Sequence, residues 1–452
     1  MVTNKARPSK SAPALQSSIT VHTSLLFNSK HKCFDEDISL VVSAVTGLIT
    51  SVYRRTSVLP DVLPSAHLDL RHLTILPGLV DAHTHVFLHA YSETPSLNQM
   101  RDESLVERTI RATNHVRTAL LAGYTTYRDL GTEGAYDSDI HVRDAINRGL
   151  IPGPRLFVAT ECLASSGGYE VRIESRDRVS VPRICDPCDG VDGCRAAVRR
   201  RLGAGADVIK FYADYRKRES RWPRPQWPGC PEIGFPPGTG DGKGEKGRIA
   251  DERNPNLLLF TQEEMNVIVS EAKRANAAVA AHACSPEAVV MAANAGVTSV
   301  EHAYVRSDVA IEAMAHNKTI FVPTLATVEL YADDMTSPLE QTRKAFEAGV
   351  KLACGGDTGA FPHGKNVREL ELMHQAGVPL EHVLAAATIH GWDACGGDLV
   401  GRRFGSLEEG WAADLVGIKG DPRKDSSNLR QVEFVMKDAR VWKRDGMAVG
   451  VA

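Results

Sequence analysis

The stretch LPGLVDAHTHVFLH, residues 76–89, places His83 and His85 two positions apart just after an apolar run at residues 75–80. An extended strand directs side chains i and i+2 to the same face, so both imidazoles can reach one metal ion. Pro77 and Gly78 indicate a turn into this strand, and Asp81 is placed to orient an imidazole. Such a pair taken alone is more often solvated or packed in a core. The case for a metal site must therefore come from the rest of the chain.

The composition describes an ordinary globular protein. The chain has 452 residues, of which 43% are hydrophobic and 24% are charged, and its formal net charge is -3. This length fits one large barrel with an accessory domain, or several domains of ordinary size. Basic and acidic residues nearly balance, which argues against a nucleic-acid partner. No apolar run reaches the ~20 residues that span a bilayer, so no membrane association is expected.

The N-terminal residues and the cysteines bear on localisation. Residues 1–17 contain Lys5, Arg7 and Lys10 but no acidic residue, which faintly resembles an organelle transit peptide. A disordered polar tail is the favoured interpretation, because this segment lacks the hydrophobic core of a secretion signal. The nine cysteines are few and odd in number, which indicates reduced thiols and not a disulfide framework. The sequence therefore predicts a cytoplasmic protein.

The order of apolar patterns predicts an α/β fold. Residues 18–76 and 397–452 contain short β-rich pieces, whereas in residues 77–396 helical stretches alternate with short apolar runs, including expected strands at 319–325 and 351–355. This alternation predicts a (β/α)8 TIM barrel, and the two β-rich ends predict a small β-sandwich domain built from both termini. A doubly wound open sheet is the competing topology, but no G-x-G-x-x-G follows a first strand. Residues 222–256 form an irregular insertion, for which a lid at the barrel mouth is expected.

Polar side chains stand at the ends of four further predicted strands. Lys210 ends DVIK, His282 ends AVAAH, His302 ends SVEH, and Asp357 follows LACGG. Each one alone has a structural explanation as a salt-bridge partner, a core histidine or a helix cap. In a β/α barrel, however, the carboxyl ends of all strands meet on one face. The repeated placement therefore predicts one pocket shared with the two histidines of the opening stretch.

These residues together resemble the metal-dependent amidohydrolase superfamily. The order H-x-H, Lys210 in GADVIK, His282, His302 and Asp357 in GGDT is typical of it. Three segments are similar in sequence to one branch of this superfamily, which includes imidazolonepropionase-like, prolidase-like and ochratoxinase-like enzymes. They are PGLVDAHTH at 77–85, AGYTTYRDLGTEG at 122–134 and GSLEEGWAADLV at 405–416. The resemblance covers residues 20–445 and implies a barrel with a β-sandwich built from both termini.

The resemblance also implies a binuclear metal centre. His83, His85 and Asp357 would hold one divalent ion and His282 and His302 a second. Lys210, carboxylated by carbon dioxide, would join the two sets. Zinc is the expected metal, since the ligands are nitrogen and oxygen atoms, although manganese, cobalt or iron would also fit. Two metals activate a water for attack on a carbonyl, with Asp357 as ligand and base. The family further suggests a homo-oligomer.

The substrate is less evident than the reaction. After Lys210, where a small Gly-rich segment is usual in the ochratoxinase-like pattern, this chain has Tyr212, Ala213, Asp214 and Tyr215. Tyr212 and Tyr215 can contact substrate or pack in the barrel wall, and His363 lies in a loop that can reach the substrate. Arg216 or Arg218 can hold a carboxylate or simply be solvated.

Two further features have both a functional and a structural explanation. Cys185, Cys188 and Cys194 resemble a zinc knuckle, but no fourth ligand follows at the usual spacing, so ordinary thiols are expected. Arg128 and Asp129 end another predicted strand and either support the site or pair as structural ions.

The sequence therefore predicts a metal-dependent hydrolase that cleaves a C–N amide bond of a small N-acyl amino acid or dipeptide-like substrate. A cyclic amide hydrolase of the imidazolone or lactam type is the alternative within enzymes. Lys210 argues against it, since imidazolonepropionase itself usually works with one metal and no bridging lysine. A catalytically silent barrel kept as a binding module is a third hypothesis, which an intact ligand set disfavours.

Overall fold

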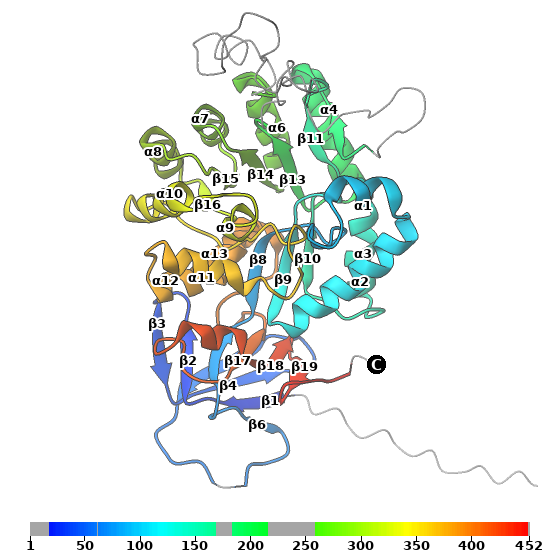
Figure 1. Ribbon diagram of the computed structural model, residues 1–452. Coiled ribbons are helices and arrows are strands. Elements are labelled where there is room, and N and C mark those ends of the chain that lie inside the picture. The colour runs from blue at the N-terminus through cyan, green and yellow to red at the C-terminus, as the bar shows by residue number, and fades with distance from the viewer. Residues whose placement is uncertain (1–17, 61, 169–182, 216–257, 451–452) are drawn as a thin grey trace, which may run out of the picture.

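The computed structural model describes residues 18–60, 62–168, 183–215 and 258–450. The expected N-terminal tail at 1–17 and the insertion at 222–256 lie outside these residues. Within them the fold is α/β. Figure 1 shows strands surrounded by helices in one part of the molecule and a β-rich part at its lower end, where the blue N-terminal strands meet the red C-terminal ones.

The helix-rich part contains two arcs of parallel strands. One arc has the order β10-β9-β8, and the other has the order β12-β11-β13-β14-β15-β16. The strand bounds are β8 (Leu79–Thr84), β9 (Tyr124–Asp129), β10 (Arg155–Val158), β11 (Cys162–Ala164), β12 (Cys185–Pro187), β13 (Val208–Tyr212), β14 (Ala278–Ala283), β15 (Ser299–His302) and β16 (Ile320–Val322).

Helices cover the outside of these arcs (Figure 1). They are α1 (Ser96–Asp102), α2 (Leu105–Leu121), α3 (Ser138–Asn147), α4 (Gly190–Ala204), α6 (Gln262–Arg274), α7 (Pro286–Ala295), α8 (Asp308–Asn317), α9 (Leu325–Val328), α10 (Thr336–Glu347), α11 (Val367–Gln375), α12 (Leu380–Ala386) and α13 (Ile389–Ala394). Local sequence explains where two of them start. Thr261 and Glu264 form a capping box at α6, and Ser285 caps α7 ahead of Pro286.

The eight-stranded closed barrel predicted from the sequence is not present as one continuous ladder in the described residues. The strand expected at 351–355 is replaced by single contacts on both sides: Leu352 forms a bridge with Phe321, and the Ala82 amide donates to the Cys354 carbonyl over 2.8 Å. Small residues let this segment approach closely, since a Cβ on Gly355 would lie 2.7 Å from the His83 nitrogen. At the other junction of the two arcs, the Asp207 amide, just before β13, donates to the carbonyl of Val158 at the end of β10 over 2.8 Å.

The strand expected at 319–325 is also shorter than predicted. It ends at Val322, and α9 begins at Leu325 after Thr324, whose φ of 51° turns the chain out of the strand. Helices α1, α12 and α13 and strands β11 and β12 were not predicted. These elements have three to seven residues, too few to show a clear hydrophobic period.

The β-rich part combines strands from both ends of the chain. A seven-stranded sheet has the order β20-β19-β18-β17-β7-β2-β3, and a four-stranded sheet has the order β5-β4-β1-β6. Side chains of both sheets share one apolar core that includes Val21, Leu40, Ile75 and Phe434. The strands are β1 (Ser18–His22), β2 (Leu25–Asn28), β3 (Cys33–Glu36), β4 (Ile38–Ser43), β5 (Ile49–Arg54), β6 (His67–Asp69), β7 (Thr74–Pro77), β17 (Leu415–Ile418), β18 (Val432–Lys437), β19 (Arg440–Arg444) and β20 (Met447–Ala448).

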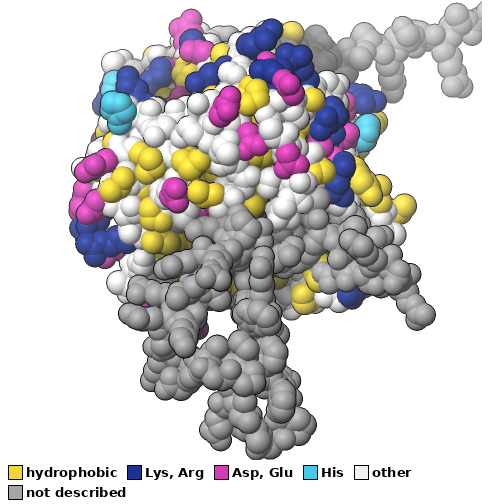
Figure 2. All heavy atoms as spheres, turned by 90° about the horizontal axis from the view of Figure 1, so that it is seen from above, with side chains coloured by type: hydrophobic (Ala, Val, Ile, Leu, Met, Phe, Trp, Pro, Cys, Tyr) yellow, Lys and Arg dark blue, Asp and Glu magenta, His cyan; other side chains and the backbone are white. Residues whose placement is uncertain are grey.

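The described surface carries charges of both signs. On the face seen from above, basic and acidic side chains lie interspersed with hydrophobic ones (Figure 2). None of the described helices is long and apolar enough to cross a lipid bilayer.

Candidate metal centre

The parallel strands bring the six predicted ligands to one cavity. Lys210 lies in β13, and the register pairs Tyr212 with His282 in β14 and Ala283 with His302 in β15. His83 belongs to β8, and His85 follows it directly. The cavity has a volume of about 810 Å³. Its lining includes all six residues: His83, His85, Lys210, His282, His302 and Asp357.

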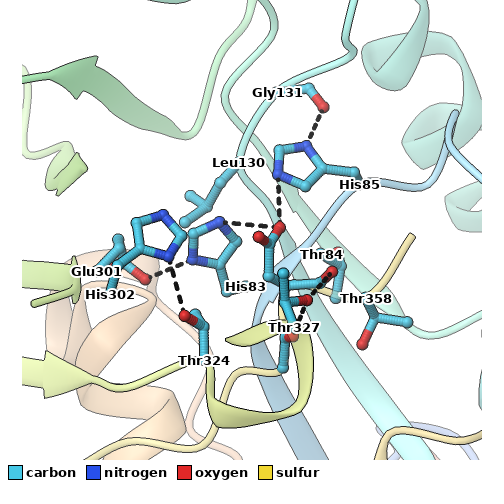
Figure 3. A network of polar contacts seen from close by, with 12 residues as sticks. His83, Thr84, His85, Leu130, Gly131, Glu301, His302, Thr324, Thr327 and Thr358 are labelled. Atoms are coloured by element: carbon cyan, nitrogen blue, oxygen red, sulfur yellow. Dashed lines mark hydrogen bonds and ion pairs between the residues drawn. The ribbon is translucent and has the colours of Figure 1, made fainter. Parts of the chain in front are cut away.

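Asp357 is the point on which the first group of ligands converges. Its Oδ1 lies 3.1 Å from His85 Nε2 and 3.5 Å from His83 Nε2. The ligand atoms of His83, His302 and Asp357 all lie within 4.8 Å of one another. In Figure 3 the imidazoles of His83, His85 and His302 lie close together. Asp357 has a φ of 60°, and His302 has one of 77°. Both residues thus have a strained backbone of the kind that is concentrated at functional sites.

A hydrogen bond on the far side of each ring fixes its orientation. His83 Nδ1 donates to Glu301 Oε2 over 2.8 Å, and His85 Nδ1 donates to the Gly131 carbonyl over 2.8 Å (Figure 3). His302 Nδ1 is 2.9 Å from the hydroxyls of both Thr324 and Tyr304. The Nε2 atoms of His83 and His85 are therefore left to face Asp357 and the cavity, as metal-binding imidazoles require.

Arg128 in β9 supports the orientation of His83 through Glu301. Its guanidinium is fully buried and donates to Glu301 Oε1 over 2.9 Å. Burial alone would raise the pKa of Glu301, but Arg128 and the hydrogen bond from His83 lower it to about 2. The sequence left open whether Arg128 supports the site or pairs structurally, and the structure shows that it does both. Asp129 instead accepts from the Val86 amide over 2.7 Å.

Sequence reasoning missed Glu301 and assigned its role to Asp81. Asp81 accepts from the His83 backbone amide and contacts no imidazole ring in the described contacts. Glu301 was overlooked because neighbouring residues in a strand normally point to opposite faces. The positive φ of His302 breaks this alternation, so that both Glu301 and His302 contact His83. The position of Glu301 directly before the candidate ligand His302 was the feature of the sequence that could have identified it.

Lys210 provides the test of whether a metal fits. The side chain is 2% exposed, and its Nζ has no hydrogen-bond partner among the described residues. Burial lowers the pKa of this amine. A buried, unpaired amine is costly unless it is modified or bound to something. An amine of lowered pKa can react with carbon dioxide, and the resulting carbamate offers two oxygens to cations. The residues present therefore fit a metal-bound site.

The protonation states of the histidines agree with metal ligation, with one exception. Burial lowers the pKa of His83 to about 4 and places those of His282 and His302 well below their usual range. Neutral imidazoles are the form that binds metals. Burial also lowers the pKa of His85, but its hydrogen bond with Asp357 outweighs this and raises the value to about 9. His85 must release that proton to become a ligand.

His282 belongs to a second group of possible ligands. Its Nε2 lies 3.5 Å from Cys284 Sγ and 3.9 Å from Asp214 Oδ1. The ligand atoms of these three residues lie within 4.8 Å of one another. Cys284 was not selected from the sequence, although its spacing of two positions from His282 is the same as that of His83 and His85. Rings of His282 and His302 lie 4.4 Å apart between centroids, so the two groups are neighbours.

The predicted substrate residues divide into two sets. Tyr212 and Tyr215 line the cavity, and their ring centroids lie 4.9 and 5.4 Å from that of His282. His363 does not belong to the described lining: its ring stacks on His115 with centroids 4.3 Å apart, and its Nε2 lies 3.1 Å from the Leu88 carbonyl. The structure thus gives His363 a packing position behind the site and not the predicted substrate contact.

The other candidates of the sequence do not join the site. Cys185, Cys188 and Cys194 are buried and form no disulfide among the described residues, and none belongs to a described group with metal-ligand geometry. Arg216 and Arg218 lie outside the described residues.

Comparison with known proteins agrees with this geometry. The model of the Amidohydrolase family matches residues 74–443. Ochratoxinase from Aspergillus niger is 25% identical over 413 residues, which cover 82% of this chain and 76% of that protein. Imidazolonepropionase from Clostridium tetani is 22% identical over 439 residues, covering 90% and 92%. The structure of a Xaa-Pro dipeptidase with methionine bound in its active site matches with a TM-score of 0.75 at 29% identity, covering 94% of this chain and all of that one. The chain therefore belongs to the Amidohydrolase family.

Proposed function

We propose that this protein is a metal-dependent hydrolase that cleaves the C–N amide bond of a small N-acyl amino acid or dipeptide-like substrate. The observation that carries the proposal is Lys210, whose buried amine lacks a hydrogen-bond partner among the described residues. It acts electrostatically on His83, His282 and Asp357, the members of both ligand groups. The cost of burying this unpaired amine would be offset if its carbamate bound two metal ions.

His83, His85 and Asp357 would hold one divalent ion, and His282 and His302 a second, with the carbamate of Lys210 shared between them. Zinc is favoured by the imidazole and carboxylate ligands. When bound, two such ions lower the pKa of a water and polarise a carbonyl oxygen. The carbamate itself forms when the neutral amine attacks carbon dioxide, which creates an N–C bond and releases one proton.

Asp357 is suited to carry the proton of the reaction. The neighbouring imidazoles and Lys210 hold the pKa of its carboxyl below the usual range, although burial alone would raise it. Its side chain faces the cavity and lies within 3.1 Å of His85. Asp357 can take the proton of the attacking water and return it to the leaving nitrogen, as general base and then general acid. Tyr212 and Tyr215, which line the same cavity, would orient the substrate.

The relatives support amide hydrolysis more than ring opening. The similar proteins include a Xaa-Pro dipeptidase and ochratoxinase. Imidazolonepropionase is also similar and keeps a cyclic amide hydrolase as the second candidate. Lys210 argues against an imidazolonepropionase in particular, because that enzyme usually works with one metal and no bridging lysine. We further infer that the two strand arcs form the wall of one (β/α)8 barrel at 77–396, and that residues 18–76 and 397–452 form the sandwich domain.

The test is a reconstitution of activity from the metal-free protein. Chelator-treated protein is incubated with zinc and bicarbonate and assayed against acyl-amino acids, dipeptides, lactams and lactones. The proposal predicts hydrolysis of linear amides that chelation abolishes and zinc restores, and that Lys210→Ala loses. Hydrolysis of lactams alone would favour the cyclic amide alternative. Reconstituted protein that cleaves no amide would contradict the proposal.

A further inference from the structure

Glu133 is an acidic side chain of the cavity that the proposed reaction does not use. It lies in the loop after β9 and belongs to the cavity lining. Its side chain is 13% exposed, so the carboxylate has lost most of its water. A carboxylate in such a place needs a compensating partner.

The described residues supply no hydrogen bond to the Glu133 carboxylate. Its Oε1 lies 3.8 Å from His85 Nδ1, beyond hydrogen-bond distance, and that nitrogen already donates to the Gly131 carbonyl. Arg108 donates to the backbone carbonyl of Glu133 over 2.8 Å, and not to its side chain. The loop is thus held through its main chain, which leaves the acidic group directed to the cavity.

The backbone at Glu133 is also strained. Its φ is 50°, a region that residues with a side chain rarely adopt, and it lies between Gly131 and Gly134, whose φ values of 144° and 85° are also positive. Such conformations cost on the order of 1–3 kcal/mol and are concentrated at functional sites. The strained backbone at Glu133 therefore supports a functional role for this residue in the cavity.

The other two carboxylates of the described lining are already engaged. Asp214 accepts from the backbone amides of Cys284 and Ser285 over 2.9 and 2.7 Å. Asp357 contacts the imidazoles of the metal ligands. The described lining contains no arginine, and its one lysine is Lys210. Among these carboxylates, Glu133 is therefore the least engaged, since its one described ion pair, with His85, is long at 3.8 Å.

We propose that Glu133 binds the protonated α-amine of the substrate, so that the protein prefers dipeptides with a free amino terminus over N-acylated amino acids. This inference rests on the proposed amide hydrolysis. Glu133 lies beside His85, which in turn lies 3.1 Å from Asp357. The α-amine of a dipeptide is one carbon away from the carbonyl that is attacked, so the two groups must bind close together. The anion of Glu133 also offsets the repulsion between an ammonium group and nearby metal ions.

The experiment compares two substrates that share one scissile bond. Zinc-loaded wild-type protein is assayed with Leu-Phe and with N-acetyl-Leu-Phe, and the comparison is repeated with Glu133→Gln. Asp333→Asn serves as the matched control. It removes one negative charge from the exposed segment beside Tyr331, which lines the cavity. Zinc content is measured for each protein so that a damaged metal site is recognised.

The inference predicts that kcat/KM for the free-amine substrate exceeds that for the acetylated one by about tenfold or more in the wild type, the effect expected of one charge-assisted hydrogen bond. Glu133→Gln should remove this preference mainly by raising KM for Leu-Phe, with N-acetyl-Leu-Phe and zinc content little changed. Asp333→Asn should keep the preference.

Three results would overturn the inference. They are equal hydrolysis of the two substrates by the wild type, an equal loss on both substrates in Glu133→Gln, and an equal loss of preference in Asp333→Asn. In each case amide hydrolysis by the wild type still stands. Failure of the wild type on every linear amide would instead remove the proposed function on which the inference rests.

Discussion

Replacing Glu301 by glutamine perturbs the support of His83 while leaving the size of the side chain unchanged. Glu301 is fully buried and accepts from Arg128 over 2.9 Å and from His83 Nδ1 over 2.8 Å. A glutamine amide can still accept from Arg128, but it turns an NH2 group toward the nitrogen that formerly donated. His83 must then accept at Nδ1 and carry its proton on Nε2, the atom that faces Asp357.

Two magnitudes follow from this geometry. Arg128 is fully buried, and a buried charge that loses its charged partner typically costs about 3–5 kcal/mol. Arg128 keeps its bonds to the carbonyls of Ala82 and Ala394, so we expect the lower end, about 3 kcal/mol, for Glu301→Gln. The wrong tautomer of His83 should weaken zinc binding about 10- to 100-fold, as is typical when the partner of a metal-binding histidine is lost.

The assay separates stability from metal binding. Urea denaturation of the metal-free protein gives the free energy of unfolding, and zinc titration against a competing chelator gives the affinity. Asp414→Asn is the control, because Asp414 is 1% exposed and paired with Arg155, and neither residue belongs to the described lining of the cavity. The control should lose stability at unchanged zinc affinity. Wild-type zinc affinity in Glu301→Gln would refute the tautomer argument, and wild-type stability would refute the argument from the buried ion pair.

Three further changes have defined outcomes. Lys210→Met should raise the unfolding free energy of the metal-free protein by about 1–3 kcal/mol, because it removes a buried unpaired amine, yet abolish amide hydrolysis; lower stability in urea would contradict this. Burial raises the pKa of Glu369 from 4.5 to about 8, so the folded protein keeps a proton that the unfolded chain loses, and stability falls as pH rises through this window. The unfolding free energy of Glu369→Gln should therefore rise relative to that of the wild type between pH 5 and 8, by up to about 1.4 kcal/mol per pH unit. A difference in unfolding free energy that does not change with pH would contradict this. Gly359→Ala should cost about 1–3 kcal/mol and weaken zinc binding, since the glycine has a φ of 129° and an added Cβ would lie 2.7 Å from the His85 carbonyl; unaltered thermal unfolding would contradict that placement.

Regular alternation made most of the elements predictable. Helix α7 and strand β15 belong to the alternation of helices and strands that the apolar pattern of residues 77–396 predicts. The meeting of the six candidate ligands in one cavity was predictable for the same reason, because each stands at the carboxyl end of an expected strand. A single rule, the convergence of parallel strand ends, brought together residues as distant as His83 and Asp357.

What could not be predicted depends on backbone conformations that break the pattern. At His302 a positive φ breaks the usual alternation, so that Glu301 contacts His83, and the segment before Asp357 joins its neighbour through the single bridge of Leu352 with Phe321. Loop residues were also uncertain. His363 follows a barrel strand as a substrate contact would, but it stacks on His115, whereas Glu133, in a loop after β9, reaches the cavity. Sequence spacing alone does not say which loop residue turns inward.

The most direct test of the central claim is a titration of zinc into the metal-free protein, with hydrolysis of a linear amide followed at each point. Activity should reach its maximum at two zinc ions per chain in the presence of bicarbonate. The variant Asp357→Asn should stay inactive at every zinc concentration. Amide hydrolysis by the metal-free protein, or full activity of Asp357→Asn, would contradict it.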